Sequence, residues 1–329
     1  MIRRLLMGLG ATLALVTVVF FLGPVYSLDT RDASLDVPQQ TEALERWLET
    51  SEQRYDDIIP GTEKHIRWAH ADRRRTPLSV IYLHGYTATR QEVDPLCDEL
   101  GEALGANVFY TRLAGHGRNP RAMGEVSGND WLRDAREALE VGRVLGERVI
   151  VVGTSTGGTL ALWLAERQES SPIVSLVLIS PNLGPRARSS ELLIGPWGAE
   201  LLKLLQGEEY RWTPHNAEQA KYWTWQYPSR ALLPMMALVR VVRESPIENI
   251  RTPTLVIYSP NDRVVNTQEI LKAHARLGST VKPLIAVENS GDPSNHVLAG
   301  RILSPNETPR LREQILEFVR ALPEVTDTL

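Results

Sequence analysis

The sequence predicts an α/β fold built on a mainly parallel, doubly wound sheet. Short β-branched or apolar runs alternate with amphipathic helical patterns, which is typical of parallel strands joined by right-handed crossovers. Polar residues follow several of these runs, at the strand ends where ligands bind in such sheets. The predicted strands cover 61–70, 78–83, 106–113, 148–152, 174–179, 254–258 and 283–287, and the predicted helices cover 91–104, 131–145, 160–165, 268–277 and 309–322.

One stretch, residues 186–245, interrupts this alternation. It holds four of the eight tryptophans, together with three tyrosines. We predict a mostly helical cap here, in which most aromatic side chains pack the cap onto the core and a few line an apolar pocket. The α/β core then consists of residues 61–185 and 246–329. Residues 29–60 are predicted to form a linker and an amphipathic helix.

The amino-terminal segment has a different composition from the rest. Leu5–Leu28 contains 24 residues and no charge, which is long enough to cross a bilayer. We predict a transmembrane signal anchor over residues 1–28. Arg3 and Arg4 would stay on the inner side, so the catalytic domain would lie on the outer, periplasmic or extracytoplasmic, side as a single-pass protein. The alternative is a signal peptide cleaved after Ser27, which would release a secreted protein.

Composition excludes several classes of function. The net charge of −4 argues against nucleic-acid binding. The single cysteine, Cys97, excludes an internal disulfide and a cysteine zinc site, and its helical spacing with neighbouring leucines indicates a buried core thiol. A hydrophobic content of 43% is ample for a core of this size. The chemistry predicted below requires no metal or organic cofactor, and the sequence does not indicate the oligomeric state.

The strongest single motif lies between the strand at 148–152 and the helix at 160–165. Residues 153–157 read Gly-Thr-Ser-Thr-Gly, which fits the G-x-S-x-G nucleophile elbow. Such a turn holds its serine in a strained conformation and places the hydroxyl clear of the sheet edge. Ser155 is therefore the predicted nucleophile. The G-x-S-x-G string alone also occurs in ordinary turns. Its value as evidence for a nucleophile therefore depends on the flanking strand and helix, and on finding a base and an acid elsewhere in the chain.

A serine nucleophile needs a base, and the base needs a carboxylate to orient it. In this architecture the expected order along the chain is serine, acid, histidine. Asp262 follows the strand at 254–258, and His296 lies in the loop after the last strand, so both satisfy that order. Asp292 is a rival acid in the same loop as His296, and Glu288 is a weaker one.

Two backbone amides are predicted to bind the oxyanion. One belongs to Thr156, directly after the nucleophile, and the other to Tyr86, after the turn at His84 and Gly85. His84 and His116 also lie beside glycines. For both we favour a structural role over a catalytic one.

Taken together, the motifs resemble those of the α/β-hydrolase superfamily, in its serine carboxylesterase and monoacylglycerol lipase branch. They are HGYTAT, RLAGHG, GTSTGG, SPNDRVV and SNHVLAG, and the resemblance runs from about residue 78 to the carboxyl end, interrupted by the cap. It implies an α/β-hydrolase fold, a serine hydrolase of esters, the triad Ser155, Asp262 and His296, and oxyanion donors at Tyr86 and Thr156. The elbow departs from the pattern at Thr154 and Thr156, where related lipases often carry His, Met or Gln.

The predicted function is hydrolysis of carboxylic esters through an acyl-enzyme. The aromatic cap and the apolar amino end favour a lipid-like or monoacylglycerol-like substrate, with the membrane as partner through the amino-terminal helix. An acyltransferase, a thioesterase or a peptidase on the same triad remains open, as does a non-catalytic binding protein on this fold.

Overall fold

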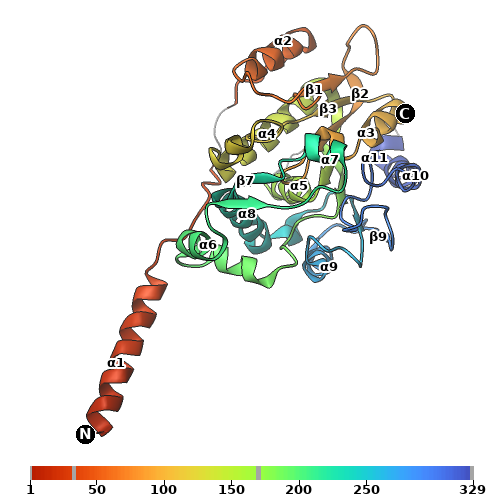
Figure 1. The fold of residues 1–329 in the computed structure, drawn as a ribbon. Coiled ribbons are helices and arrows are strands. Elements are labelled where there is room, and N and C mark those ends of the chain that lie inside the picture. The colour runs from red at the N-terminus through yellow and green to blue at the C-terminus, as the bar shows by residue number, and fades with distance from the viewer. Residues whose placement is uncertain (1, 32–34, 168–171, 327–329) are drawn as a thin grey trace.

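The computed structural model describes residues 2–31, 35–167 and 172–326. Its centre is a seven-stranded sheet in the order β1-β3-β2-β4-β5-β8-β9 (Figure 1). All neighbouring strands are parallel except β1, which runs antiparallel to β3. The predicted mainly parallel sheet is therefore confirmed. The strands are β1 (His65–Arg67), β2 (Thr76–Leu83), β3 (Asn107–Tyr110), β4 (Gly146–Thr154), β5 (Ile173–Ile179), β8 (Thr254–Tyr258) and β9 (Leu284–Ala286).

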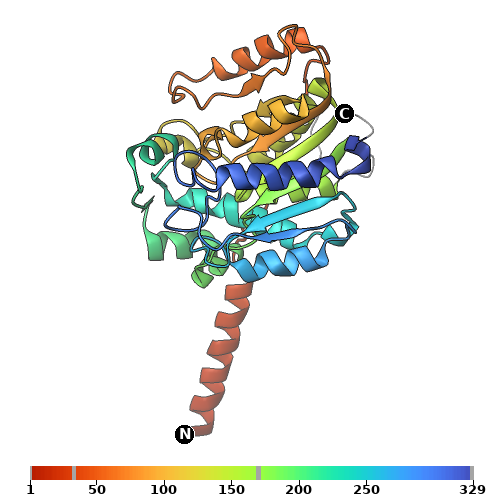
Figure 2. The ribbon, with the colours of Figure 1, turned by 90° about the vertical axis from the view of Figure 1, so that its right-hand side faces the viewer.

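Helices cover both faces of this sheet and bury a separate apolar core on each. One core lies under α2 (Thr41–Glu52), α4 (Gly128–Leu145), α5 (Thr156–Glu166), α8 (Leu232–Glu244) and α9 (Thr267–Arg276). The other lies under α3 (Leu96–Leu104), α10 (Thr308–Arg320) and α11 (Pro323–Thr326), and it includes Cys97, which is fully buried as predicted. Figures 1 and 2 show the two layers on opposite sides of the sheet. This is the doubly wound arrangement that βαβ crossovers produce.

Two predicted elements differ from the observed ones. The first predicted strand, 61–70, is a strand only over His65–Arg67, at the edge of the sheet. The helix predicted over 91–104 divides into a short 3-10 turn, η1 (Arg90–Glu92), and α3. Pro95 lies between them, and a proline ring disfavours the helical conformation of the residue before it.

The segment predicted as a mostly helical cap consists mainly of helical elements and also contains one small sheet. It contains α6 (Gly198–Gln206), α7 (Ala217–Tyr222) and α8, but also a two-stranded antiparallel sheet of β6 (Glu209–Arg211) and β7 (Gln226–Pro228). Tyr210 and Tyr227 pair across this small sheet with their rings stacked at 5.5 Å. Aromatic cross-strand pairs of this kind stabilise short hairpins, and the sequence pattern did not indicate one here.

The transmembrane span predicted within residues 1–28 is not supported. Over the part of the chain that the structure describes, no helix has both the length and the apolar character needed to cross a membrane. Helix α1 (Ile2–Phe21) extends away from the body of the molecule (Figures 1 and 2). The rest of the predicted apolar run leaves the helix and packs on the cap, where the amide of Trp197 donates to the carbonyl of Pro24 at 2.9 Å and Arg240 donates to that of Tyr26 at 2.9 Å.

A buried ion pair fixes α2 to the core. Arg112, in the loop after β3, donates from Nε and Nη2 to the two carboxylate oxygens of Glu52 at 2.8 and 2.7 Å, and it also donates to the carbonyl of His116 at 3.2 Å. The amide of Lys64 donates to the same carboxylate at 3.0 Å. Burial by itself would raise the pKa of Glu52, but the hydrogen bond and charge of Arg112 lower it below its ordinary value.

This pair generates a stability prediction. Glu52→Gln should lower the free energy of unfolding by about 3–5 kcal/mol, because it leaves the Arg112 guanidinium buried without a counter-charge. Since the pKa of Glu52 is lowered by folding, the stabilisation should be complete above the ordinary carboxylate pKa and should fade as the pH falls through the folded value. Urea unfolding across pH, followed by tryptophan fluorescence, measures both effects.

The matched control is Glu49→Gln, at an exposed position of the same helix. It should change the free energy of unfolding by less than about 0.5 kcal/mol. Equal effects of the two substitutions would contradict the role assigned to the ion pair.

Candidate active site

The turn between β4 and α5 has the strained shape predicted for a nucleophile elbow. Ser155 lies between the two elements with φ 52° and ψ −116°, outside the regions that residues with side chains favour. A Cβ at Gly157 would lie 1.8 Å from the carbonyl oxygen of Leu83, and one at Gly153 would lie 2.5 Å from that of Gly157. The first turn of α5 therefore packs directly on the ends of β2 and β4, and only glycine permits that approach.

Asp262 and His296 meet across the loops that follow β8 and β9. His296 Nδ1 is 2.8 Å from Asp262 Oδ2, and both side chains are buried. The other oxygen, Asp262 Oδ1, accepts hydrogen bonds from the amides of Val264 and Val265 at 2.7 and 2.9 Å. Burial would lower the pKa of His296, but the charge and hydrogen bond of Asp262 outweigh it, so the pKa is raised above its ordinary value. The carboxylate is thus placed to hold one tautomer of the imidazole and to stabilise its protonated form.

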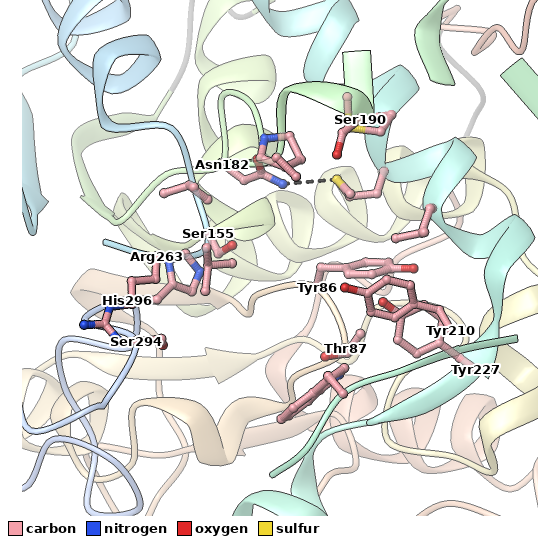
Figure 3. A pocket seen from close by; sticks show the side chains of 18 of the residues that line it. Tyr86, Thr87, Ser155, Asn182, Ser190, Tyr210, Tyr227, Arg263, Ser294 and His296 are labelled. Carbon is pink, nitrogen blue, oxygen red and sulfur yellow. Dashed lines mark hydrogen bonds between the residues drawn. The ribbon is translucent and has the colours of Figure 1, made fainter. Parts of the chain in front are cut away.

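Ser155 and His296 line the same cavity, which has a volume of about 800 Å³ (Figure 3). Among the described residues, the structure forms the hydrogen bond between His296 and Asp262 but none between Ser155 and His296. Catalytic hydrogen bonds often close only when substrate binds, so the absence of this bond does not remove either residue from the site. The structure brings the three residues of the predicted triad to one end of the sheet, and their catalytic roles stay a prediction.

The rival acid Asp292 has a different set of partners. It accepts hydrogen bonds from the amides of Ser294, His296 and Val297 at 2.9–3.0 Å. These bonds and the Ser294 hydroxyl outweigh burial and lower the pKa of Asp292. Asp292 therefore shapes the loop that carries His296 and does not contact the imidazole. The weaker rival, Glu288, is exposed.

The predicted oxyanion donors lie where topology places them. Thr156 is the first residue of α5, and Tyr86 lines the cavity after the turn that follows β2. Within the described part of the chain, neither backbone amide donates a hydrogen bond to another residue. Both are therefore available to a ligand, and their role in catalysis stays a prediction.

His84 and His116 have structural surroundings. His84 Nε2 accepts the amide of Leu113 at 3.0 Å, and Nδ1 is 3.0 Å from the carbonyl of Gly85. Burial lowers the pKa of His84 to about 4, so the ring is neutral at neutral pH. His116 packs against it, with ring centres 4.9 Å apart. The two rings join the loop after β2 to the loop after β3.

One buried acid in the cavity wall was missed by sequence reasoning. Glu92 Oε2 accepts hydrogen bonds from the Tyr82 hydroxyl and from the amide of Gly85, both at 2.8 Å. The Tyr82 hydroxyl is also 3.1 Å from Thr154 Oγ1, which ties Glu92 to the elbow. A Cβ at Gly85 would lie 2.7 Å from Glu92 Oε1 and 3.2 Å from Ser155 Cβ. Gly85 therefore packs against both the carboxyl of Glu92 and the nucleophile.

Burial is the main influence on this carboxyl, and it raises the pKa of Glu92. In the sequence, Glu92 falls within a stretch predicted as an amphipathic helix, where a glutamate indicates an exposed position. No local signal marked it as part of the site.

The cap supplies most of the apolar wall of the cavity. Several aromatic side chains of the cap line this cavity, and the sequence analysis predicted that a few would line an apolar pocket. The apolar and aromatic lining residues from the cap include Leu201, Leu202, Tyr210, Trp212, Trp223, Tyr227, Met235 and Met236. Within the described residues there is no group of His, Cys, Asp and Glu side chains arranged to hold a metal ion.

Comparison with known proteins agrees with this architecture. The family model described as serine aminopeptidase, S33, matches residues 75–290. A thermostable monoacylglycerol lipase from Bacillus sp. strain H-257 is 28% identical over 216 residues, which are 65% of this chain and 82% of that protein. A carboxylesterase from Bacillus subtilis strain 168 is 24% identical over 245 residues, 74% of this chain and 93% of that protein.

Two solved structures show the same fold. One, described with LipS and LipT as metagenome-derived lipolytic enzymes, has a TM-score of 0.67 and 23% identity, covering 80% of this chain and 99% of its own. The monoacylglycerol lipase of Paleococcus ferrophilus has a TM-score of 0.58 and 17% identity, covering 80% of this chain and 98% of its own. Since the family model covers more than half of the sequence, the chain belongs to the serine aminopeptidase S33 family, in the lipase and esterase branch of the α/β-hydrolases.

Proposed function

We propose that this carboxylic ester hydrolase acts through a triad of Ser155, His296 and Asp262. The observation that carries the proposal is the buried hydrogen bond between His296 and Asp262, formed beside a serine held at positive φ in the same cavity. A serine hydroxyl at its ordinary pKa is a weak nucleophile. An imidazole with a raised pKa and a fixed tautomer is the base that it requires.

The proposed reaction has two halves. Ser155 Oγ attacks the ester carbonyl carbon while His296 Nε2 takes its proton, and the backbone amides of Tyr86 and Thr156 bind the oxyanion. His296 then protonates the departing alkoxide, which leaves an acyl-enzyme. Water, deprotonated by the same nitrogen, attacks the acyl carbon and releases the carboxylic acid and free Ser155.

We propose a lipid-like or monoacylglycerol-like ester as substrate. The cavity of about 800 Å³ and its apolar wall of leucine, methionine and aromatic side chains suit an acyl chain. The similarity to a monoacylglycerol lipase and to a carboxylesterase supports the same class of substrate. Transfer of the acyl group to another alcohol, and thioester or peptide hydrolysis, use the same triad. A non-catalytic protein would have no physical need for it.

The location of the catalytic domain on the outer side of a membrane is also a proposal. It is supported by the sequence alone: Arg3 and Arg4, followed by an uncharged run, fit a secretory signal, which does not require the unsupported membrane span. Fractionation of cells that produce the full chain, with and without residues 1–28, distinguishes an anchored or secreted protein from one that stays inside.

The nucleophile is tested by Ser155→Ala. Turnover of p-nitrophenyl esters should fall by about 10⁴-fold or more, because no other group can form the acyl-enzyme. Labelling by a fluorophosphonate should disappear while the circular dichroism spectrum stays unchanged. The control is Ser190→Ala, a second serine that lines the same cavity from the cap side. Retained labelling in Ser155→Ala would remove this residue from the mechanism.

The acid is tested by Asp262→Asn, through the pH profile of kcat/KM. In the native enzyme the base acts when unprotonated, so activity should rise with pH through the raised pKa of His296, above about 6.5. Without the negative charge the pKa of His296 falls, so the rising limb should move to lower pH while kcat drops by about 10⁴-fold. A rising limb that does not move would show that another acid serves His296.

Glu92 is tested as a positioning residue by two substitutions. Glu92→Ala removes the acceptor of the Gly85 amide, so the neighbouring Tyr86 amide should lose its alignment and kcat should fall by about 10²-fold, with a smaller change in KM. Glu92→Gln keeps an oxygen acceptor and should recover most of that loss. If Gln and Ala reduce kcat equally, the hydrogen bond to Gly85 is not what matters.

A further inference from the structure

A second, polar pocket adjoins the catalytic cavity. It has a volume of about 430 Å³ and is lined by Arg186, Pro260, Asn261, Arg263, Asn289 and Asn295. Arg263 lines both this pocket and the cavity that holds Ser155 and His296. The two spaces therefore meet at one side chain. Nothing in the reaction proposed above uses the polar pocket.

The loops that carry the catalytic acid and base also build the polar pocket. The amide of Arg263 donates to the carbonyl of Ser294 at 2.9 Å, which joins the two loops. Arg186, in the loop after β5, donates through its amide to the carbonyl of Val264 at 2.9 Å and through Nη1 to that of Asp262 at 2.7 Å. The guanidinium of Arg186 and the main chain of Arg263 are thus fixed next to the catalytic acid.

The asparagines of this pocket are fixed in a similar way. Asn261 Nδ2 donates to the carbonyl of Glu288 at 3.0 Å, and Asn295 Oδ1 accepts the amide of Ser290 at 3.1 Å. An Asn289 side chain completes the wall. The pocket therefore presents side-chain amides next to two guanidinium groups.

The positive charge of this pocket is not neutralised. Within the described residues, the guanidinium groups of Arg186 and Arg263 form no ion pair with a carboxylate. Among the residues that the structure describes, Arg186 makes one side-chain hydrogen bond, and its acceptor is a neutral carbonyl. By contrast, Arg243 pairs with Glu191 at 2.8 Å, and Arg276 pairs with Glu248 at 2.7 Å. The carboxylate of Asp262 is buried and is hydrogen-bonded to His296 and to two backbone amides.

The position of the pocket decides which part of a substrate would reach it. In ester cleavage the leaving alcohol must lie next to the imidazole that protonates it. Figure 3 shows Arg263, Ser294 and His296 on one side of the cavity, away from Tyr210 and Tyr227. The apolar cap side is suited to the acyl chain, so the polar pocket lies on the side of the alcohol.

We propose that this pocket binds a phosphate group on the alcohol part of the ester, through Arg263 and Arg186. The inference rests on the proposed function and narrows its substrate class to esters of phosphate-bearing alcohols. Guanidinium groups bind phosphate oxygens through paired, charge-assisted hydrogen bonds, and the neighbouring asparagine amides are further donors. A neutral glycerol ester lacks the group that would occupy the pocket.

The experiment compares two substrates that differ only in the phosphate, decanoylglycerol and decanoylglycerol phosphate. For the native enzyme at low salt, kcat/KM should be higher for the phosphate ester, and the preference should shrink as salt screens the arginines. Arg263→Gln and Arg186→Gln should each lower the ratio of kcat/KM for the phosphate ester to kcat/KM for the neutral ester by about 5- to 10-fold. The ratio is the measure because Arg186 also donates to the carbonyl of Asp262, so its loss affects the cleavage of both esters.

The control is Arg251→Gln, because Arg251 is also exposed and also donates to a backbone carbonyl, that of Gly278 at 2.8 Å. It should leave both substrates unaffected. Equal kcat/KM of the native enzyme for the two esters, or equal losses on both esters in the Arg263 and Arg186 variants, would overturn the phosphate site and leave the ester hydrolase proposal standing. Failure of the native enzyme to cleave either ester, with no fluorophosphonate labelling, would overturn both.

Discussion

The close contact between the first turn of α5 and the ends of β2 and β4 is the constraint on which the site depends. A Cβ at Gly157 would lie only 1.8 Å from the carbonyl oxygen of Leu83. This contact fixes the elbow and holds Ser155 at positive φ. The strain, which is of the order of 1–3 kcal/mol at such positions, persists because the sheet and the helix on either side are buried and rigid.

The other parts of the site are organised around that elbow by groups that are themselves buried. Glu92 and Tyr82 connect the oxyanion loop to Thr154 of the elbow through hydrogen bonds. Asp292 gathers three backbone amides of the loop that carries His296. A buried acceptor that loses its donors is costly, so each of these acids holds its loop in one conformation.

Two carboxylates near His296 show how environment separates their tasks. Asp262 faces the imidazole and raises its pKa, whereas Asp292 has its oxygens occupied by amides and by the hydroxyl of Ser294. Both are aspartates at nearly complete burial, so residue type and burial do not distinguish them. The difference arises from which atoms each carboxylate faces, so Asp262, in the loop after β8, and Asp292, in the loop after β9, have different roles.

The sequence by itself determined the alternating strands and helices, the glycine-flanked elbow and the order of Ser155, Asp262 and His296, because periodicity and turn chemistry are local. It did not determine the role of Glu92, the small sheet of the cap, or the unpaired arginines beside the active site. It also predicted a transmembrane span that the described residues do not support, since part of that apolar run packs on the cap. Those features depend on contacts between segments far apart in the chain, and only the tertiary structure decides which side chains are buried together and which stay free.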